Sequence, residues 1–206
     1  MILELHPENP EVRILKVIAE NLRNGDVYIF PTDTVYSFIA DSKSKIGLEK
    51  LYILKDLEKS KPLSLLCNDI STASEFVESL SNSAFKLMKR ITPGPFTFIF
   101  KANKNISRVN LTNHKTKSIG IRIPDNQYIR SLLEIHGGTL TGTSVYSSDE
   151  YISDPEDLER IYGKKVKGII NGGVLKQELS TIIDFSSGEI EILREGKGFD
   201  LLSEDH

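Results

Sequence analysis

The segment Phe30-Pro31-Thr32-Asp33-Thr34-Val35-Tyr36 concentrates the most chemistry in this sequence. It follows a short apolar run, 27–30, which is typical of a β-strand. Two hydroxyls, a carboxylate and a phenol then fall on the few residues where that strand must end. Such groups at a strand end can hold a small polar ligand. They can equally cap backbone amides in a Pro-Thr-Asp turn, and the residues alone leave the two interpretations about even.

Arg122 is the second candidate for ligand binding. It lies in Gly120-Ile121-Arg122-Ile123-Pro124, a predicted strand in which the two isoleucines face the opposite side. An arginine on a strand is usually solvated on the outside of a sheet. On the floor of a cleft, its planar guanidinium would instead suit a carboxylate or a phosphate.

Hydroxyl and cationic side chains recur near other predicted strands. Thr97 could point from the strand 96–101 into a cleft. Thr143 and Ser144 end another strand, in a stretch that is either a phosphate-binding loop or an ordinary Ser/Thr-rich loop. The sequence also has a lysine cluster, Lys55, Lys59 and Lys61, which is usually a solvated face. Arg194, followed by Glu195-Gly196, is a weak signal by itself.

Composition restricts the class of protein. The 206 residues are 39% hydrophobic and 27% charged, which favours one globular domain over residues 1–206. The apolar runs are too short to span a bilayer and the N-terminus lacks a signal pattern, so we expect a cytoplasmic protein. One cysteine, Cys67, and four scattered histidines predict no disulfide and no structural metal. The net charge of −3 argues against indiscriminate nucleic-acid binding, so RNA contact would need a local basic patch.

The order of predicted elements favours an α/β fold with a mixed twisted sheet. The first helix is expected between the cap Asn9-Pro10 and the stop Gly25. Further helices are predicted over 46–55, 69–80, 81–91 and 126–135, and from Asp154-Pro155 onward. Strands are predicted over 27–30, 63–67, 96–101, 119–123, 139–143 and 167–171, and as a hairpin that pairs 181–185 with 189–193. The polar segment 103–118 is expected to be mobile.

Several common catalytic motifs are missing from the sequence. It has no G-x-x-x-x-G-K-[ST] loop, no G-x-G-x-x-G and no G-x-S-x-G. A conventional kinase, a Rossmann enzyme and a serine hydrolase are therefore disfavoured.

Taken in chain order, these segments resemble the YrdC/YciO family, from about residue 9 to residue 198. The resemblance rests on Pro31 to Tyr36 with Asp41, Lys55, Lys61-Pro62-Leu63, Pro93 to Thr97, Gly120 to Pro124, Thr143-Ser144, Ser180-Thr181 and Arg194 to Gly196.

This resemblance implies a YrdC-like twisted sheet around a large concave cavity and L-threonylcarbamoyladenylate synthase activity. Such enzymes join L-threonine, bicarbonate and ATP, with Mg²⁺, into threonylcarbamoyl-AMP and pyrophosphate for tRNA modification. On the same resemblance, Thr32, Thr34, Tyr36 and Arg122 would bind the amino acid. The implied nucleotide-binding residues are Lys55, Lys61, Thr97, Thr143, Ser144 and Arg194. Fixed cations would stabilise charge on the transferring phosphate without a covalent intermediate.

Two positions depart from the synthase branch of this family. Its Lys-x-Arg reads Lys55-Asp56-Leu57 here, and its Ser-x-Asn reads Ser144-Val145-Tyr146. These changes resemble the YciO-like branch. Two functions therefore stay open: a synthase, and a protein that binds double-stranded RNA, tRNA or ribosomal RNA with little or no synthase activity.

Overall fold

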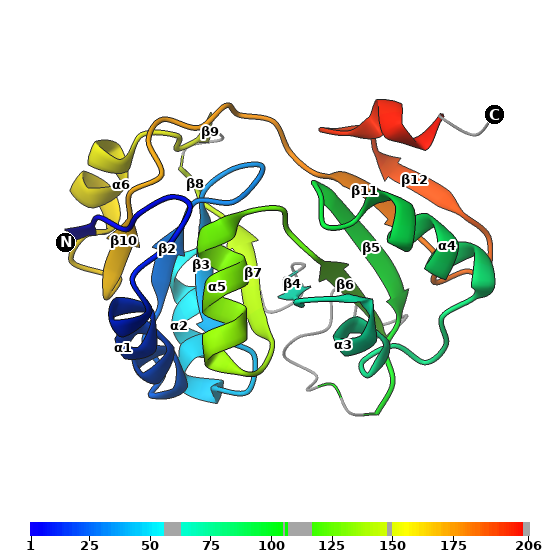
Figure 1. Cartoon of the computed structure of the whole chain (residues 1–206), viewed down its shortest axis with the longest axis horizontal. Coiled ribbons are helices and arrows are strands. Elements are labelled where there is room, and N and C mark those ends of the chain that lie inside the picture. The colour runs from blue at the N-terminus through cyan, green and yellow to red at the C-terminus, as the bar shows by residue number, and fades with distance from the viewer. Residues whose placement is uncertain (56–62, 105, 107–116, 148–149, 204–206) are drawn as a thin grey trace.

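A mixed β-sheet of ten strands runs along the long axis of the molecule (Figure 1). The structure is a computed structural model and describes residues 1–55, 63–104, 106, 117–147 and 150–203. The strands lie in the spatial order β1-β10-β2-β3-β7-β4-β6-β5-β11-β12. Their bounds are β1 Ile2–Leu3, β2 Tyr28–Phe30, β3 Ser37–Asp41, β4 Ser64–Leu66, β5 Phe96–Lys101, β6 Ser118–Arg122, β7 Leu140–Ser144, β10 Gly168–Ile170, β11 Thr181–Asp184 and β12 Glu191–Arg194. Two short strands, β8 Tyr146–Ser147 and β9 Glu150–Tyr151, form a separate antiparallel pair.

Helices cover both faces of the sheet where β2 and β3 lie. Helices α1 (Val12–Arg23) and α5 (Gln127–His136) pack on one face, and α2 (Lys45–Leu54) and α6 (Pro155–Tyr162) on the other. Within β2, Tyr28 and Phe30 face the first pair of helices and Ile29 faces the second. The apolar run 27–30 is continuous because this strand is buried on both faces.

The other end of the sheet has its own apolar core. Helices α3 (Ile70–Ser74) and α4 (Asn82–Ile91) pack over β5 and β6 there. A short 3₁₀ helix, η2 (Phe199–Leu202), follows β12 near the C-terminus (Figure 1). The segment 171–180, drawn in orange, passes over the top of the molecule from β10 to β11.

The predicted α/β fold with a mixed sheet is confirmed. Helix α5 begins after Asn126, whose side chain accepts a hydrogen bond from Ile129 N at 3.3 Å. Helix α6 begins after Asp154, which caps Glu156 N at 2.8 Å. Strands β11 and β12 pair antiparallel, as the predicted hairpin requires.

The prediction that Asn9 caps the first helix is wrong. Helix α1 begins at Val12, and Glu11 stands at the N-cap without a side-chain cap. The imidazole of His6 explains the difference, because its Nδ1 accepts the backbone N–H groups of Glu8 and Asn9 at 3.3 and 3.1 Å. These bonds hold the residues before the helix in a turn.

Other elements also differ from those predicted from the sequence. Strand β3 was not predicted, although all five of its residues are buried and it pairs with both β2 and β7. The helix expected over 69–80 ends at Ser74, and Val77 instead forms an isolated bridge with Ala102. The expected mobility of 103–118 falls largely on residues outside those described.

No helix in the described part of the chain combines the length and apolarity that a membrane crossing requires.

Candidate functional site

The Thr32–Thr34 segment forms the turn between β2 and β3. The Thr32 hydroxyl donates to Val35 O at 2.7 Å and accepts from Thr34 N at 3.1 Å, and the two threonine hydroxyls lie 2.9 Å apart. Both side chains are buried. Because the single Thr32 proton goes to Val35 O, Thr34 donates to Thr32 and keeps its own lone pairs. The turn interpretation therefore holds for Thr32, whereas Thr34 can still accept from a ligand.

Arg122 reaches this turn from β6. Its Nη2 donates to Asp33 Oδ1 at 2.6 Å, and the two side chains are only 8% and 7% exposed. The other carboxylate oxygen of Asp33 accepts from Asp125 N at 3.1 Å. Arg122 therefore points into the protein, and a solvated position on the outside of the sheet is excluded.

The guanidinium of Arg122 is only partly satisfied. Its Nε is buried and has no hydrogen-bond partner among the described residues. Burial lowers the pKa of Arg122, and the charge of Asp33 opposes this effect. A buried donor without a partner costs roughly 1–3 kcal/mol, so a ligand that accepts from it is favoured here.

Lys197 holds the same turn from the other end of the chain. Its Nζ donates to the Asp33 carbonyl oxygen at 2.6 Å, across 164 residues of sequence. Sequence reasoning missed this residue, because a single lysine after Arg194-Glu195-Gly196 carries no signal of its own. Asp33 belongs to the segment that the sequence indicates as a ligand site, but no binding role was predicted for it.

A second group of polar residues joins β5, β11 and β12. Arg194 donates from Nε to Ser180 O at 2.8 Å and from Nη2 to Ser180 Oγ at 3.0 Å. Ser180 Oγ lies 2.9 Å from Thr97 Oγ1, and both hydroxyls are buried. Burial lowers the pKa of Arg194 and repulsion from Arg122 adds to this, while Tyr151 opposes it. Arg194 and Arg122 are thus close enough to repel each other.

A third group contains Lys55 at the end of α2. Its Nζ donates to Thr143 Oγ1 at 2.6 Å and lies 4.9 Å from the ring centroid of Tyr146. That ring in turn lies 5.9 Å from the ring of Tyr151. An aromatic face attracts a cation, so Tyr146 and Thr143 together fix the lysine head. Predicted residue Lys61 lies outside the described residues.

Ser144 and Tyr36 lie where the first and third groups adjoin. Ser144 is paired with Ser37 across β7 and β3, and Val145 N donates to Tyr36 O at 2.8 Å. The Tyr36 hydroxyl donates to Gly173 O and accepts from Gly172 N, both at 2.9 Å. Burial raises the pKa of Tyr36 to about 12, so the phenol stays protonated at neutral pH. Tyr36 thereby attaches the segment 171–180 to the segment 30–36, which we call the motif. Contact between Tyr36 and a substrate stays a prediction.

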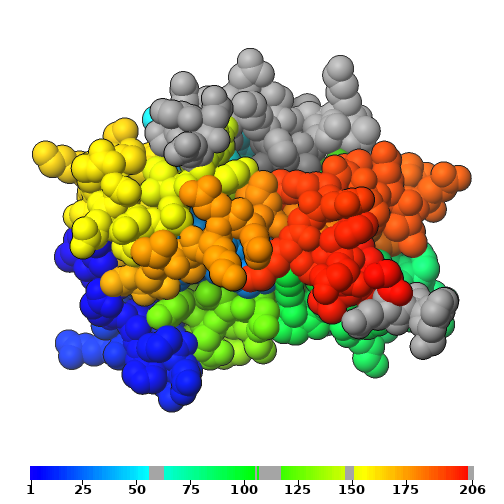
Figure 2. All heavy atoms as spheres, turned by 90° about the horizontal axis from the view of Figure 1, so that it is seen from above, coloured from blue at the N-terminus to red at the C-terminus, as the bar shows by residue number. Residues whose placement is uncertain are grey.

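The face viewed in Figure 2 carries this overlying segment. Orange residues lie between the yellow region of α6 and the red C-terminal region. Hydrogen bonds hold the segment at Tyr36, at Ser153 through Leu175 N (3.1 Å) and at Tyr151 through Gln177 Nε2 (2.8 Å). It is therefore attached both to the motif and to the region of β9.

By its fold and its candidate site, the chain is an α/β protein in which lysine and arginine side chains lie close to threonine hydroxyls at several strands of one sheet. It belongs to the Sua5/YciO/YrdC family, whose model, described as "Telomere recombination", matches residues 20–196.

Comparisons with individual proteins agree with this assignment. The chain is 36% identical to the uncharacterized protein YciO of Escherichia coli (strain K12) over 196 residues, 94% of each protein. The crystal structure of E. coli YciO has a TM-score of 0.89 and covers 96% of both chains at 34% identity. The threonylcarbamoyl-AMP synthase of Mus musculus is 27% identical over 191 residues, 88% of this chain and 66% of the mouse protein. The structure of P. abyssi Sua5 complexed with L-threonine has a TM-score of 0.87 at 22% identity and covers 95% of this chain and 57% of that chain.

The resemblance found in the sequence is thus confirmed, including its similarity to YciO. The family includes threonylcarbamoyl-AMP synthases, and the YciO relative is the more similar in sequence. The substrate and nucleotide roles of individual residues, the cavity and the RNA partner stay predictions.

Proposed function

We propose that the chain is a threonylcarbamoyl-AMP synthase-like enzyme that binds L-threonine at Arg122 and reacts it with bicarbonate and ATP. The observation that carries this proposal is that Arg122 is buried and its hydrogen-bond donors are only partly used. Its guanidinium is buried, has one carboxylate contact and keeps a buried Nε without a partner among the described residues. A ligand carboxylate accepts from such a donor set with charge-assisted hydrogen bonds.

The adjacent turn suits the rest of an amino acid. Thr34 Oγ1 keeps lone pairs that can accept from a ligand ammonium or hydroxyl group. Its burial keeps water away from that contact. The L-threonine that accompanies P. abyssi Sua5 supports the choice of this amino acid as the first ligand to test.

The proposed reaction has two steps that balance without another reactant. The neutral threonine amine adds to bicarbonate and gives a carbamate and water. A carbamate oxygen then bonds to the α-phosphorus of ATP while the bond to pyrophosphate breaks. Arg194 and Lys55 are the proposed cations for the phosphates, and their neighbours Ser180 and Thr143 orient them.

Mg²⁺ would come with the ATP that the family's synthases use. In the described portion of the chain, no three His, Cys, Asp or Glu side chains gather as a set of metal ligands. The carboxylate of Asp33 is already engaged with Arg122. These residues fit an ion held mainly by the triphosphate, where it would neutralise phosphate charge.

Tyr146 is expected to slow this chemistry. It stands where the synthase branch has an asparagine, and its ring lies against Lys55 in place of an amide that could donate to a phosphate from that position. Losing one donor that stabilises developing charge commonly costs about 10²–10³ in rate. We therefore expect synthase activity below that of enzymes with the polar residue, and Tyr146→Asn should raise it.

Pyrophosphate release tests the proposal. With ATP, L-threonine and bicarbonate all present, pyrophosphate should form above the level seen when any one is omitted. Thr34→Val, which removes the accepting oxygen and keeps the side-chain volume, should lower the rate. If the wild type forms pyrophosphate equally well when L-threonine or bicarbonate is left out, the proposed synthase activity is contradicted. If tRNA or ribosomal RNA binds while ATP and L-threonine do not, the RNA-binding alternative takes its place.

A further inference from the structure

Lys197 is attached to the molecule by its backbone before its side chain reaches the site. Its N–H donates to Leu179 O at 2.8 Å, and its carbonyl accepts from Thr181 Oγ1 at 3.1 Å. It also forms an isolated parallel bridge with Ser180. The backbone of Lys197 is therefore held beside the start of β11, so the position of its ammonium is restricted although the residue is exposed.

The ammonium of Lys197 contacts Asp33, which Arg122 also binds. Three donors bind Asp33, each at a different oxygen: Arg122 at Oδ1, Asp125 N at Oδ2 and Lys197 at the carbonyl. Side chain and backbone of Asp33 are thus fixed separately. Because Thr32 and Thr34 flank this residue, its backbone position sets where the Thr34 hydroxyl lies relative to Arg122.

The contact between Lys197 and Asp33 also adds positive charge to the site. Lys197 adds a third cation to a region where Arg122 and Arg194 already repel each other, and the Asp33 carboxylate pairs with Arg122 alone of the three. An anionic ligand reduces this repulsion. The arrangement suits a carboxylate better than a neutral ligand.

We propose that Lys197 is a positioning residue for the amino-acid substrate: by holding the Asp33 carbonyl it fixes the Thr32–Thr34 turn at the distance from Arg122 that a bound carboxylate needs. This inference rests on the proposed function. It adds a residue from the C-terminal segment to a site otherwise built from the β2–β3 turn and β6.

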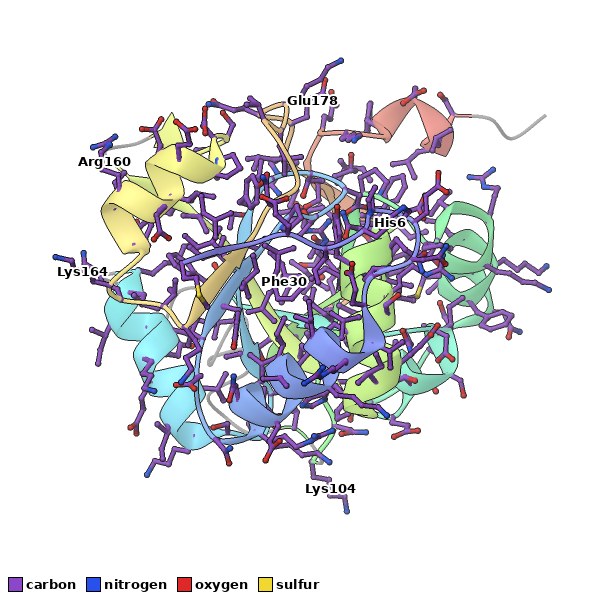
Figure 3. The ribbon with its side chains drawn as sticks, turned by 60° about the vertical axis from the view of Figure 1, so that its left-hand side comes forward. His6, Phe30, Lys104, Arg160, Lys164 and Glu178 are labelled. Carbon is purple, nitrogen blue, oxygen red and sulfur yellow. The ribbon has the colours of Figure 1, made fainter. Side chains whose placement is uncertain are left out.

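Lys197→Met tests the contact, because methionine keeps an unbranched apolar stem and removes the donor. L-Threonine affinity should fall about three- to tenfold, the usual worth of one such hydrogen bond. Hydrogen exchange of the backbone amides over 32–36 should become faster. Lys197→Arg, which keeps a cation and a donor, should restore both. Lys164→Met is the matched control, since Lys164 is exposed and points away from the molecule beyond α6 (Figure 3).

The outcomes separate the inference from the proposed function. If Lys197→Met matches the wild type in both threonine affinity and exchange, Lys197 does not position the turn. A lower thermal midpoint with unchanged affinity would make its role merely structural and would also overturn the inference. If the wild type does not bind L-threonine, the proposed function fails, and the exchange measurement alone still decides whether Lys197 holds the turn.

Discussion

At the scale of single residues, the buried pair of Asp33 and Arg122 dominates the site. A buried ion pair is weak evidence for stability as a whole, because desolvation offsets much of its attraction. Removing one partner is different, since the remaining charge is then buried and uncompensated. The pair therefore makes the site sensitive to either residue.

Asp33→Ala should lower the free energy of unfolding by about 3–5 kcal/mol, because Arg122 would stay buried without its carboxylate. Urea denaturation at neutral pH measures this change. Asp125→Ala is a matched acidic control, since the Asp125 side chain is 64% exposed and only its backbone N–H contacts Asp33. The control should stay within about 0.5 kcal/mol of the wild type. Equal effects of the two replacements would show that the Arg122 pair is not buried as described.

At the scale of elements, the segment 171–180 depends on one close approach. A Cβ on Gly172 would lie 2.5 Å from Pro31 Cβ, closer than real Cβ atoms come to one another. Gly172 N also donates to the Tyr36 hydroxyl. The glycine therefore lets this segment pack directly on the motif turn.

Gly172→Ala should displace the segment from Pro31 and weaken its hydrogen bonds to Tyr36. We expect a loss of about 1–3 kcal/mol in the free energy of unfolding, together with faster amide exchange near Gly172 and Gly173. Gly47→Ala in α2 is the control, because its Cβ would meet neighbours only at ordinary distances of 3.4 Å or more. Alanine is the better helix former, so the control should be neutral or slightly stabilising. An unchanged stability and exchange pattern in Gly172→Ala would contradict the close packing.

The sequence predicts a helix start well where a local cap signal has no competing partner, as His6 competes at Asn9. Asn126 and Asp154 cap their helices because the cap and the amide it binds lie two or three residues apart. Strand β3 has no such signal. Its apolar centre is short and polar residues flank it, so its burial depends on β2 and β7, which pair with it from both sides.

The same distinction holds within the site. Residue type and position indicate Thr32, Thr34 and Arg122, and in the structure Arg122 of β6 binds Asp33, which lies between the two threonines. Lys197 could not be selected, because its contact spans 164 residues and depends on the path of an exposed side chain. The contact between Lys55 and the Tyr146 ring was equally hidden, since sequence indicates only that a polar residue is missing there.

At the scale of the whole molecule, the candidate site joins distant parts of one sheet. The β2–β3 turn, β6 and the segment after β12 meet at Asp33. Thr97 of β5 and Ser180, which directly precedes β11, lie beside Arg194. Family membership fixes this framework, and the sequence is nearer to YciO than to the mouse synthase. The proposed enzyme and the RNA-binding alternative share this framework. They differ in whether an amino acid binds at Arg122.

Calorimetry on the unaltered protein tests this most directly, with L-threonine compared with L-threoninol in the presence of a non-hydrolysable ATP analogue. The two ligands differ only in the carboxylate, so the folding of a variant does not enter the comparison. We predict that L-threonine binds and that L-threoninol binds at least about tenfold more weakly, because charge-assisted hydrogen bonds to Arg122 are lost. Equal affinities for the two ligands, or no binding of L-threonine at millimolar concentration, would contradict a carboxylate site at Arg122.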